Sequence, residues 1–461
     1  MHPLVGLLVL VVLPVAACQG TTKAAGAPAA FGPVLIGGDV PALSDCGPRD
    51  ARAGRAVEPS LAASRDGRIL VVAWQQDRRR SGGALAIQAA VSRDGGRHWK
   101  STYLPHQGAC TSGSFTAVSD PSTAVTASGR ALVASLLLRS AASTFDTEVA
   151  LSSSSDGGAN WSDPAPIAVA SSPGPVLDKP WLAVDSNHPE RLAASWIEYD
   201  DPEGRFVNAN GEDVTKNRAR AALSNDAGAQ WTAPATMYES AAGHEVQFPQ
   251  PVRVGAAWLA VLAEGDPSLG EAHSSAVLRT AQTTTGDAWR PMPDAARLPV
   301  TGVTVGGATL RFASWCFTLT ARGALYAGWA TDTDGGGTVI HVVRSDDGGR
   351  SWAETASNRA SGDDAVLPTV AVDGRGHVLL LWYAVAGGPN GGLHVKPEAA
   401  ESSDRGRTWH RLDLRADFDL PRSDGFFVGD YIGVAALPAG FAVAYPVAVP
   451  TGTRIAFRII A

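Results

Sequence analysis

Short apolar stretches recur in closely spaced pairs along most of the chain, and each stretch is too short for a typical helix. In the first pair, residues 59–64 and 69–74 flank a polar turn at Asp66-Gly67. Apolar runs with alternating positions, bounded by Gly and Asp, are typical of antiparallel strands joined by tight turns. Matching pairs start at Pro121, Pro180, Pro249, Ser314, Pro368 and Gly429. The pattern therefore predicts an all-β chain built from repeated strand pairs.

Each strand pair except the last is followed by a short motif that combines Ser, Asp, Gly and Trp. The motif reads Ser-x-Asp-x-Gly-x-x-Trp in five places, and a degraded copy covers residues 283–289. The good copies contain Asp94 and Trp99, Asp156 and Trp161, Asp226 and Trp231, Asp347 and Trp352, and Asp404 and Trp409. Together with Trp289, these tryptophans lie 57 to 70 residues apart. A regular spacing of this length indicates a repeat architecture.

One repeat contains two strands, a loop, a third strand, the motif turn and a fourth strand. This order is that of a four-stranded antiparallel sheet, the blade of a β-propeller. The last pair, residues 429–445, is followed by one strand at 454–460, whereas the apolar residues 33–36 precede the first pair without a partner. Pairing these two terminal strands in one blade removes both free edges. We therefore expect one closed propeller domain over residues 32–461, with seven blades favoured and six as the alternative.

The repeated motif is the Asp box, and the chain resembles the sialidase-like Asp-box (BNR repeat) β-propeller proteins. The resemblance covers about residues 33–461. In that family the boxes lie on the turn between the third and fourth strands, on the side away from the ligand. The motif residues also suit a structural role. The Asp accepts backbone N–H bonds, the Gly adopts a conformation that is costly for other residues, and the Trp packs on the neighbouring sheet.

Acidic residues gather just before the expected innermost strands, where the loops of a propeller converge on one mouth of the central channel. The catalytic candidates are Glu58, Asp430 and the adjacent Tyr431. The ligand-binding candidates are Asp120, Asp178, Lys179, Asp364 and Arg253, together with Arg78, Arg79 and Arg80 of a basic loop. Converging carboxylates can act as acid and base or hold sugar hydroxyls. The structural alternatives are capping of strand ends beside proline for the acids, a solvated loop for the three arginines, a rim salt bridge for Arg253, and packing at a strand entry for Tyr431.

The resemblance to true sialidases implies three arginines that clasp the substrate carboxylate, a Tyr nucleophile assisted by Glu, and an Asp acid/base. Arginines suit such a substrate because they pair with a carboxylate through two hydrogen bonds. This sequence departs from the pattern where the first innermost strand is expected to open with Arg-Ile-Pro, because it reads Val57-Glu58-Pro59. An acid therefore stands near the place where the first clasping arginine belongs.

Three functions follow from these residues, and the sequence leaves open whether the protein is an enzyme. The first is a propeller that recognises a glycan or another extracellular ligand at the channel mouth, with glycoside hydrolysis as a further step. The second is a non-catalytic interaction scaffold. The third is a true exo-sialidase, which the missing Arg-Ile-Pro phrase disfavours.

The first residues have the pattern of a bacterial lipoprotein signal. An apolar run over residues 4–17 is too short to span a bilayer comfortably, and residues 15–18 resemble a lipoprotein cleavage box. That resemblance implies a signal peptide over 1–17, a lipid on Cys18 and a flexible tether over 18–31. We expect a membrane-anchored, extracytoplasmic lipoprotein at the cell surface or in the periplasm. Plain secretion is the alternative, because Lys and Arg are missing before the apolar run.

Cysteines, charge and loops add smaller expectations. Cys46 and Cys110 lie in polar, Gly-containing loops about one repeat apart and are expected to pair in an oxidising compartment, whereas Cys316 is interpreted as a buried thiol. Three free cysteines are the alternative. The net charge of −7 argues against nucleic acid as a partner. We expect no cofactor and no metal site, although residues 208–213 faintly resemble a calcium loop. The expected state is a monomer with a carbohydrate or other extracellular ligand.

Overall fold

The computed structural model describes residues 31–43, 46, 50–80, 82–141, 144–172, 174–200, 216–241, 244–265, 274–300, 304–305, 308–309, 320–321, 324–332, 338–355, 358–359, 364–414, 416–420 and 429–461. The predicted signal peptide, Cys18, Cys316 and the 208–213 loop lie outside these residues. Within them the regular elements are strands, apart from two short 3-10 turns at Ala109–Thr111 and Pro389–Gly391. The all-β prediction is therefore confirmed.

The first half of the chain forms antiparallel sets of four strands. The first set is β2 (Ala56–Ala63), β3 (Leu70–Arg78), β4 (Ala84–Ser92) and β5 (Lys100–Tyr103), and the second is β6 (Ala117–Val125), β7 (Ala131–Ala141), β8 (Thr144–Ser154) and β9 (Ala165–Ala170). One residue pair, Ala84 opposite Val118, links these two sets into a continuous sheet. The next two sheets are β10 (Val176–Val184), β11 (Leu192–Asp200), β12 (Lys216–Ser224) and β13 (Ala235–Glu239), then β14 (Glu245–Val254), β15 (Ala257–Gly265), β16 (Ser274–Thr283) and β17 (Arg290–Val300).

The second half continues with one small pair and two larger sheets. The pair is β18 (Thr304–Val305) and β19 (Ala308–Thr309). The first larger sheet holds β20 (Thr320–Ala321), β21 (Leu325–Asp332), β22 (Thr338–Ser345), β23 (Ala353–Glu354) and β24 (Asn358–Arg359). The second holds β25 (Asp364–Val372), β26 (Val378–Gly387), β27 (Leu393–Ser402), β28 (His410–Asp413) and β29 (Phe418–Leu420).

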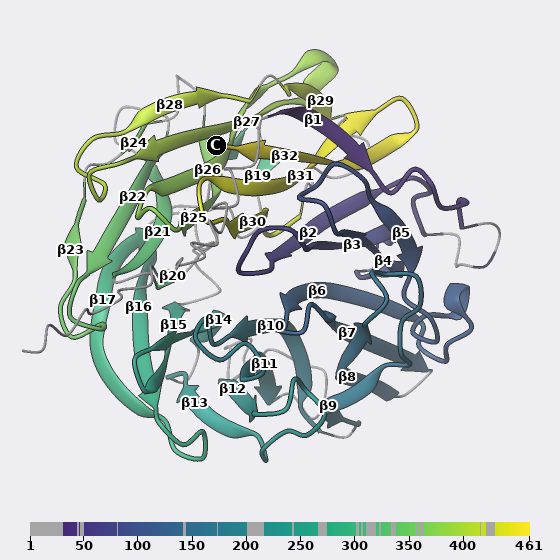
Figure 1. Ribbon diagram of the computed structural model, residues 1–461, viewed down its shortest axis with the longest axis horizontal. Coiled ribbons are helices and arrows are strands. Elements are labelled where there is room, and N and C mark those ends of the chain that lie inside the picture. The colour runs from purple at the N-terminus through teal and green to yellow at the C-terminus, as the bar shows by residue number, and fades with distance from the viewer. Residues whose placement is uncertain are drawn as a thin grey trace, which may run out of the picture.

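The remaining sheet joins both ends of the described chain. β1 (Phe31–Ile36) pairs with β32 (Gly452–Ile460), and the sheet continues through β31 (Phe441–Val449) to β30 (Gly433–Ala436). Val34 lies opposite Phe457. The prediction that the N- and C-terminal strands share one sheet is confirmed, and Figure 1 shows β1 in purple beside β32 in yellow.

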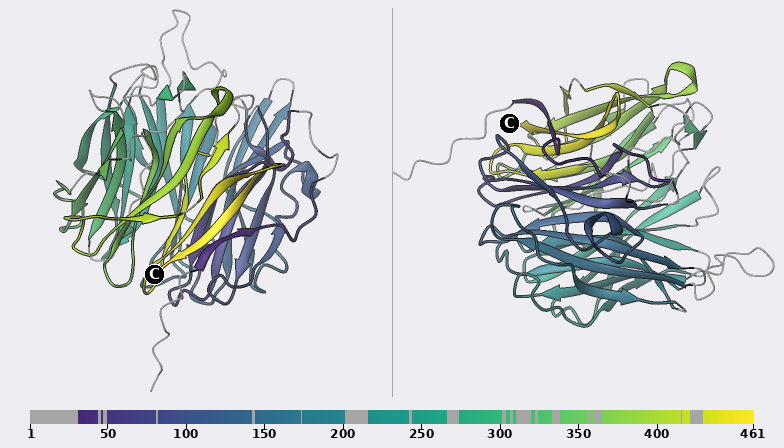
Figure 2. Two further views of the ribbon diagram at one scale, coloured as in Figure 1. Left: turned by 90° about the horizontal axis from the view of Figure 1, so that it is seen from above. Right: turned by 90° about the vertical axis from the view of Figure 1, so that its right-hand side faces the viewer.

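The sheets stand around a common centre, with β2, β6, β10, β14, β25 and β30 on the inner side (Figure 1). Seen from above in Figure 2, they stand side by side like the blades of a propeller. Apolar side chains fill the spaces between neighbouring sheets. Leu136 and Val149, for example, pack with Leu177 and Trp196 of the next sheet. Burial of this apolar surface, worth about 25 cal/mol per Å², stabilises the ring, and the arrangement is consistent with the predicted β-propeller.

Five innermost strands share a bulge in front of a proline. The strand register shifts at Glu58-Pro59, Asp120-Pro121, Lys179-Pro180, Phe248-Pro249 and Leu367-Pro368. Proline has no N–H to donate to the ladder, so pairing is interrupted there. The residue before each proline has φ between 46° and 56°, a region that residues other than Gly seldom occupy.

The bulges correct one expectation about the acidic residues. Glu58 and Asp120 do not precede their strands, since β2 begins at Ala56 and β6 at Ala117. Asp178 and Lys179 likewise lie within β10, which begins at Val176. The ladder starts before the bulge and resumes after it, so all four residues lie inside the strands.

The Asp boxes lie on the turns between third and fourth strands. In the first copy Asp94 Oδ1 accepts the backbone N–H of His98 at 2.9 Å, and Ser92 Oγ accepts that of Gly96 at 2.8 Å. Hydrogen bonds from the backbone and side chain of Asn160 lower the pKa of Asp156 to about 2. The five predicted tryptophans, Trp99, Trp161, Trp231, Trp352 and Trp409, all belong to or pack on apolar clusters. These contacts fit the structural role expected of the motif.

Two further observations bear on the compartment. Cys46 and Cys110 form the expected disulfide, with their Cα atoms 5.2 Å apart. Such bonds persist in oxidising compartments, so the disulfide is consistent with a location outside the cytoplasm. Among the described residues, no helix has the length and apolar character needed to cross a membrane.

Candidate functional site

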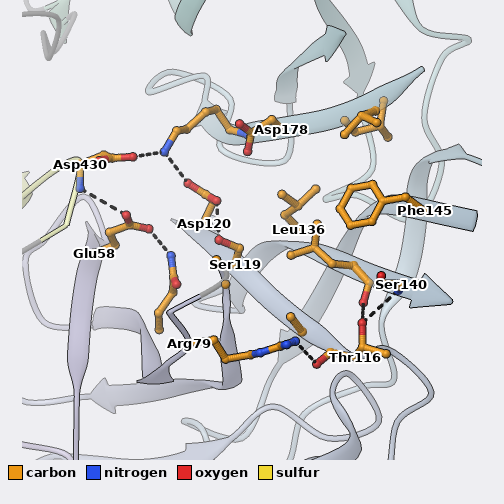
Figure 3. Close-up of a pocket in the computed structure, with 18 of the residues that line it drawn as sticks. Glu58, Arg79, Thr116, Ser119, Asp120, Leu136, Ser140, Phe145, Asp178 and Asp430 are labelled. Atoms are coloured by element: carbon orange, nitrogen blue, oxygen red, sulfur yellow. Dashed lines mark hydrogen bonds and ion pairs between the residues drawn. The ribbon is translucent and has the colours of Figure 1, made fainter. Parts of the chain in front are cut away.

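A cavity of about 590 Å³ opens at the end of the strands opposite the first Asp box. Its wall includes Arg78 and Gly83, from the end of the first sheet where Arg78 lies opposite Ala84. The box begins at Ser92, which lies opposite Leu70 at the other end of the same strands. The cavity floor comes from the bulges of β2, β6 and β10 and from the segment before β30 (Figure 3).

Lys179 lies at the centre of the charged groups on this floor. Its Nζ donates to Asp120 Oδ1 at 3.1 Å and to Asp430 Oδ2. Ser119 Oγ donates to the second oxygen of Asp120 at 2.6 Å, and the Phe248 ring centre lies 5.6 Å from Nζ. The Lys179, Asp120 and Asp430 side chains are only 4–7% exposed. Burial lowers the pKa of Lys179, but the surrounding carboxylates outweigh it and hold that pKa well above its usual value.

Glu58 lies beside this cluster on β2 and is buried. It accepts the backbone N–H of Asp430 at 3.3 Å and contacts the side-chain amide of Gln75. Burial, followed by the negative charge of Asp120, raises the pKa of Glu58 to about 8. Glu58 therefore carries a proton at neutral pH. Gln75 Oε1 is buried and has no hydrogen-bond partner among the described residues. A half turn of that amide would let Oε1 accept the Glu58 proton.

Asp178 is the half-buried carboxyl group of the floor. It directly precedes Lys179, and its Oδ1 accepts the backbone N–H of Lys179 at 2.9 Å. Burial and then the charge of Asp120 raise the pKa of Asp178 to about 6. Because Asp178 also lines the cavity, its proton can be exchanged with a bound ligand near neutral pH.

The structure brings together most of the predicted acids. Glu58, Asp120, Asp178, Lys179 and Asp430 all line the cavity. They come from β2 and β6 of one continuous sheet, from β10 of a second sheet, and from the segment before β30 of a third, so residues from three sheets meet at one point. The repeat pattern is what made this convergence predictable.

The predicted basic loop contributes Arg78 and Arg79 to the wall. Arg78 Nη1 donates to the carbonyl oxygens of Arg79 and Gly83, at 2.6 and 3.2 Å. Arg79 donates to Asp50 Oδ1 at 3.2 Å and to the carbonyl of Thr116 at 3.0 Å. Both guanidinium groups thus hold loops together. Arg80 is exposed and does not line the cavity.

Two predicted ligand-binding residues lie elsewhere. Arg253 is near the far end of β14, opposite Trp258, and its Nε lies 3.3 Å from Asp185 Oδ2. It belongs to a second hollow beside Asp346, which follows the end of β22. Arg253 therefore makes the salt bridge that was its structural alternative and does not line the carboxyl cavity. Asp364 begins β25, where it accepts a hydrogen bond from Thr338 Oγ1 at 3.1 Å, and it does not line the cavity.

Tyr431 does not have the environment of a nucleophile. Its hydroxyl donates to the carbonyl of Pro121 at 3.4 Å, and its ring meets Trp181 edge-on at 6.5 Å. Burial, then the charges of Asp120 and Glu58, raise the pKa of Tyr431 well above its usual value. An activated Tyr needs the opposite shift. These contacts fit the packing alternative for Tyr431, and a role as nucleophile stays an untested prediction.

Sequence reasoning missed several cavity residues, including Gln75, Phe145 and Glu245. Gln75 follows the apolar run of β3, so a polar residue on a buried strand was its only signal. Phe145 lies on β8. The alternation of apolar and polar residues shows which face of the sheet Phe145 is on, but not whether the next sheet covers its side chain. Glu245 starts β14, at a strand boundary that the sequence did not locate.

Metal binding gains no support from the geometry. Over the part of the chain that the structure describes, no group of three or more His, Cys, Asp and Glu side chains is arranged to hold an ion. At the floor, the positive charge between Asp120 and Asp430 is the Lys179 ammonium.

Comparisons with known proteins give distant likenesses in fold. No protein-family model matches the chain, and no curated protein matches it. A Penicillium chrysogenum alpha-L-arabinanase complexed with arabinobiose has a TM-score of 0.45 and 13% identity, over 94% of this chain and 98% of that one. The GH93 alpha-L-arabinofuranosidase of Fusarium graminearum with arabinobiose gives 0.46 and 12%, over 94% and 98%. Trypanosoma rangeli sialidase in complex with sialic acid gives 0.42 and 12%, over 78% and 55%. At values this low, the likenesses carry no argument about the site.

Proposed function

We propose that this chain binds an uncharged glycan in the cavity and hydrolyses a glycosidic bond there. The observation that carries the proposal is the set of carboxyl groups in different protonation states on one floor. Asp178 has a pKa raised to about 6, whereas Asp120 and Asp430 are paired with Lys179. Acid-catalysed glycoside hydrolysis requires one carboxyl group that carries a proton and a neighbouring one that is ionised, and their different environments set these states.

Each group has a role in this scheme. Asp178 donates its proton to the leaving oxygen as the glycosidic bond breaks, since it is the carboxyl that is half-buried at the cavity and raised in pKa. Water forms the new bond to the anomeric carbon, and the proton that it loses returns to the Asp178 carboxylate. The negative charges of Asp120 and Asp430 stabilise the positive charge that develops on the sugar ring in the transition state. Lys179 keeps these two carboxylates in place and prevents their mutual repulsion.

The charges on the wall favour an uncharged sugar. Among the described lining residues, the basic side chains are Arg78, Arg79 and Lys179, and each is bonded to a protein oxygen. Arg78 and Arg79 hold loops through these bonds, and a sugar carboxylate would meet the carboxyl groups of the floor, which repel it. This arrangement opposes sialic acid as the substrate.

The test is turnover of a panel of aryl glycosides of neutral sugars, with an aryl sialoside as the anionic comparison. We expect release from a neutral glycoside, and Asp178→Asn should lower kcat by roughly 10²–10⁴-fold. Because Asp178 must be protonated, the rate should fall as pH rises through about 6. Asp364→Asn, which changes an acid outside the cavity, is the matched control. Cleavage of the sialoside alone, or full activity of Asp178→Asn, would overturn the proposal.

A binding protein without catalysis is the second candidate, and one observation favours it. Lys179, Asp120 and Asp430 are almost fully buried and connect three sheets, which suits a clamp that holds the ring together. In that case the wild-type protein would bind neutral glycans in calorimetry but release no product from any glycoside. Asp178→Asn would then bind like the wild type.

We also propose that residues 32–461 form a single seven-bladed propeller, tethered through 18–31 to a lipid on Cys18 outside the cytoplasm. The described strands support seven blades when the longest sheet is divided at its one Ala84–Val118 link. The Cys46–Cys110 disulfide supports the compartment. Expression with the native N-terminus in a bacterial host should place the protein in the membrane fraction, and Cys18→Ala should release it.

A further inference from the structure

Phe145 is an uncovered aromatic side chain inside the cavity. It is 40% exposed, and it lines the same wall as the half-buried Leu138 and the buried Leu136. Figure 3 shows the Phe145 ring on the side of the cavity away from Asp430 and Glu58, with Leu136 beside it. One wall is therefore apolar, and the floor opposite is formed by carboxyl groups.

The position of Phe145 follows from strand alternation along the β7–β8 hairpin. Three cross-strand pairs share one face: Val149 with Leu136, Thr147 with Leu138, and Phe145 with Ser140. At the inner end, Val149 and Leu136 pack against Leu177 of β10. Val149 is 0%, Thr147 1% and Phe145 40% exposed. The row thus begins between two sheets and continues into the cavity.

A single exposed aromatic on a convex surface needs no explanation. Phe145 differs because it lies in a concave site of a size typical for ligands, next to other apolar side chains and across from polar groups. A purely apolar ligand would leave the carboxyl groups of the floor desolvated and unpaired, which is costly. A purely ionic ligand would leave the ring uncovered. A sugar ring has an apolar C–H face and polar hydroxyl edges, so it matches both walls.

We infer that Phe145 is the stacking platform of a saccharide subsite. The subsite holds an uncharged sugar unit adjacent to the glycosidic bond that receives the Asp178 proton. This inference rests on the proposed function and adds the way in which the substrate is held. The C–H face of the sugar lies on the Phe145 ring. The exposed Ser140, directly opposite on β7, supplies a hydroxyl for the edge of the same sugar.

The test measures binding separately from turnover. Each variant is made in the Asp178→Asn background, and binding of xylotriose, cellotriose, maltotriose and arabinotriose is measured one by one by calorimetry. For the trisaccharides that bind, Phe145→Ala should raise Kd roughly tenfold, and Phe145→Trp should leave Kd unchanged or lower it. Val169→Ala is the matched control, because Val169 on β9 is 63% exposed and lies outside the cavity. It should leave Kd unchanged.

The outcomes separate this inference from the proposed hydrolysis. Binding that depends on Phe145, in a protein whose wild type releases no product, supports the subsite and overturns only the catalytic step. Turnover of aryl glycosides together with an unchanged Kd in Phe145→Ala overturns the subsite and leaves hydrolysis standing. Failure of all four trisaccharides to bind also overturns the subsite. An unchanged thermal midpoint in Phe145→Ala verifies folding, since the ring is not fully packed.

Discussion

The same backbone bulge occurs on both sides of the ring, but its side chains differ sharply. On β2, β6 and β10 the residue before proline is Glu58, Asp120 or Lys179, whereas on β14 and β25 it is Phe248 or Leu367. All five have positive φ. Phe248 and Leu367 are buried in an apolar cluster, the largest among the described residues, while the three charged residues meet under the cavity.

This comparison separates backbone strain from chemistry. Positive φ in residues other than Gly is often taken as a mark of a functional site. Here Leu367 has the same φ as Glu58, 56°, yet it contributes only packing. The bulge is therefore a device of the repeat that aims one side chain of each such strand toward the centre. The identity of that side chain decides whether the position does chemistry.

The largest expected effect comes from removing the central charge. Lys179→Met leaves Asp120 and Asp430 buried without their cation, which should lower the free energy of unfolding by about 3–5 kcal/mol. Leu367→Met changes the shape at the equivalent apolar bulge and should cost less than about 1.5 kcal/mol. Urea unfolding at pH 7 compares the two variants. Equal losses would show that the charged and apolar bulges contribute alike.

The next effect concerns the pH dependence of stability. Unfolded Glu58 titrates near 4.5 and folded Glu58 at about 8, so the folded state holds an extra proton between these values. The Glu58 contribution should therefore make the free energy of unfolding fall as pH rises through this window, by at most about 1.4 kcal/mol per pH unit. Glu58→Gln should flatten that slope, and Leu367→Met should keep it. A wild-type slope in Glu58→Gln would show that Glu58 ionises normally.

A smaller loss of folding stability is expected from a substitution at Gly429, where the chain passes close to Glu58. Gly429 has φ of 111°, and a Cβ on it would lie 2.6 Å from Glu58 Cγ and 2.8 Å from its backbone nitrogen. Gly376 also has positive φ, 88°, but a Cβ there meets nothing within 4 Å. Gly376→Ala should cost about 1 kcal/mol from conformation alone, and Gly429→Ala should cost more because of the added clash. Thermal or urea unfolding measures both. A smaller loss in Gly429→Ala would contradict the close packing of that segment.

The smallest effect is expected at Arg253. This residue lies near the far end of β14, away from the carboxyl floor, so Arg253→Gln should leave kcat and KM for a neutral glycoside unchanged. A loss of activity comparable with that of Asp178→Asn would show that the opposite end of the ring takes part in the reaction.

The repeat made the fold predictable, because the motif spacing sets the order of strands and the unpaired strands at 33–36 and 454–460 specify the closure. The site was predictable only in part. Acids one or two residues before a proline pointed to Glu58, Asp120 and Asp178, since the repeat places equivalent residues around one centre. The sequence did not show that the proline of each innermost strand lies inside that strand. How far a residue lies from the bulge decides at which end of the ring its side chain stands. For Arg253 the sequence therefore left a channel position and a rim salt bridge both open, and Phe145 was missed because its exposure depends on where the next sheet stops.

The pairing of β1 with β32 also sets a condition on how this protein is made. Val34 lies opposite Phe457, although nearly the whole described chain separates them in sequence. The backbone N–H of Ala56 donates to Thr453 Oγ1 at 2.9 Å. Contacts between such distant parts of a sequence are slow to form. During synthesis, β1, the first of the described strands, keeps an unpaired edge until β32 has been made. A helper that shields the waiting strand at that stage would raise the yield of intact rings without touching the finished molecule.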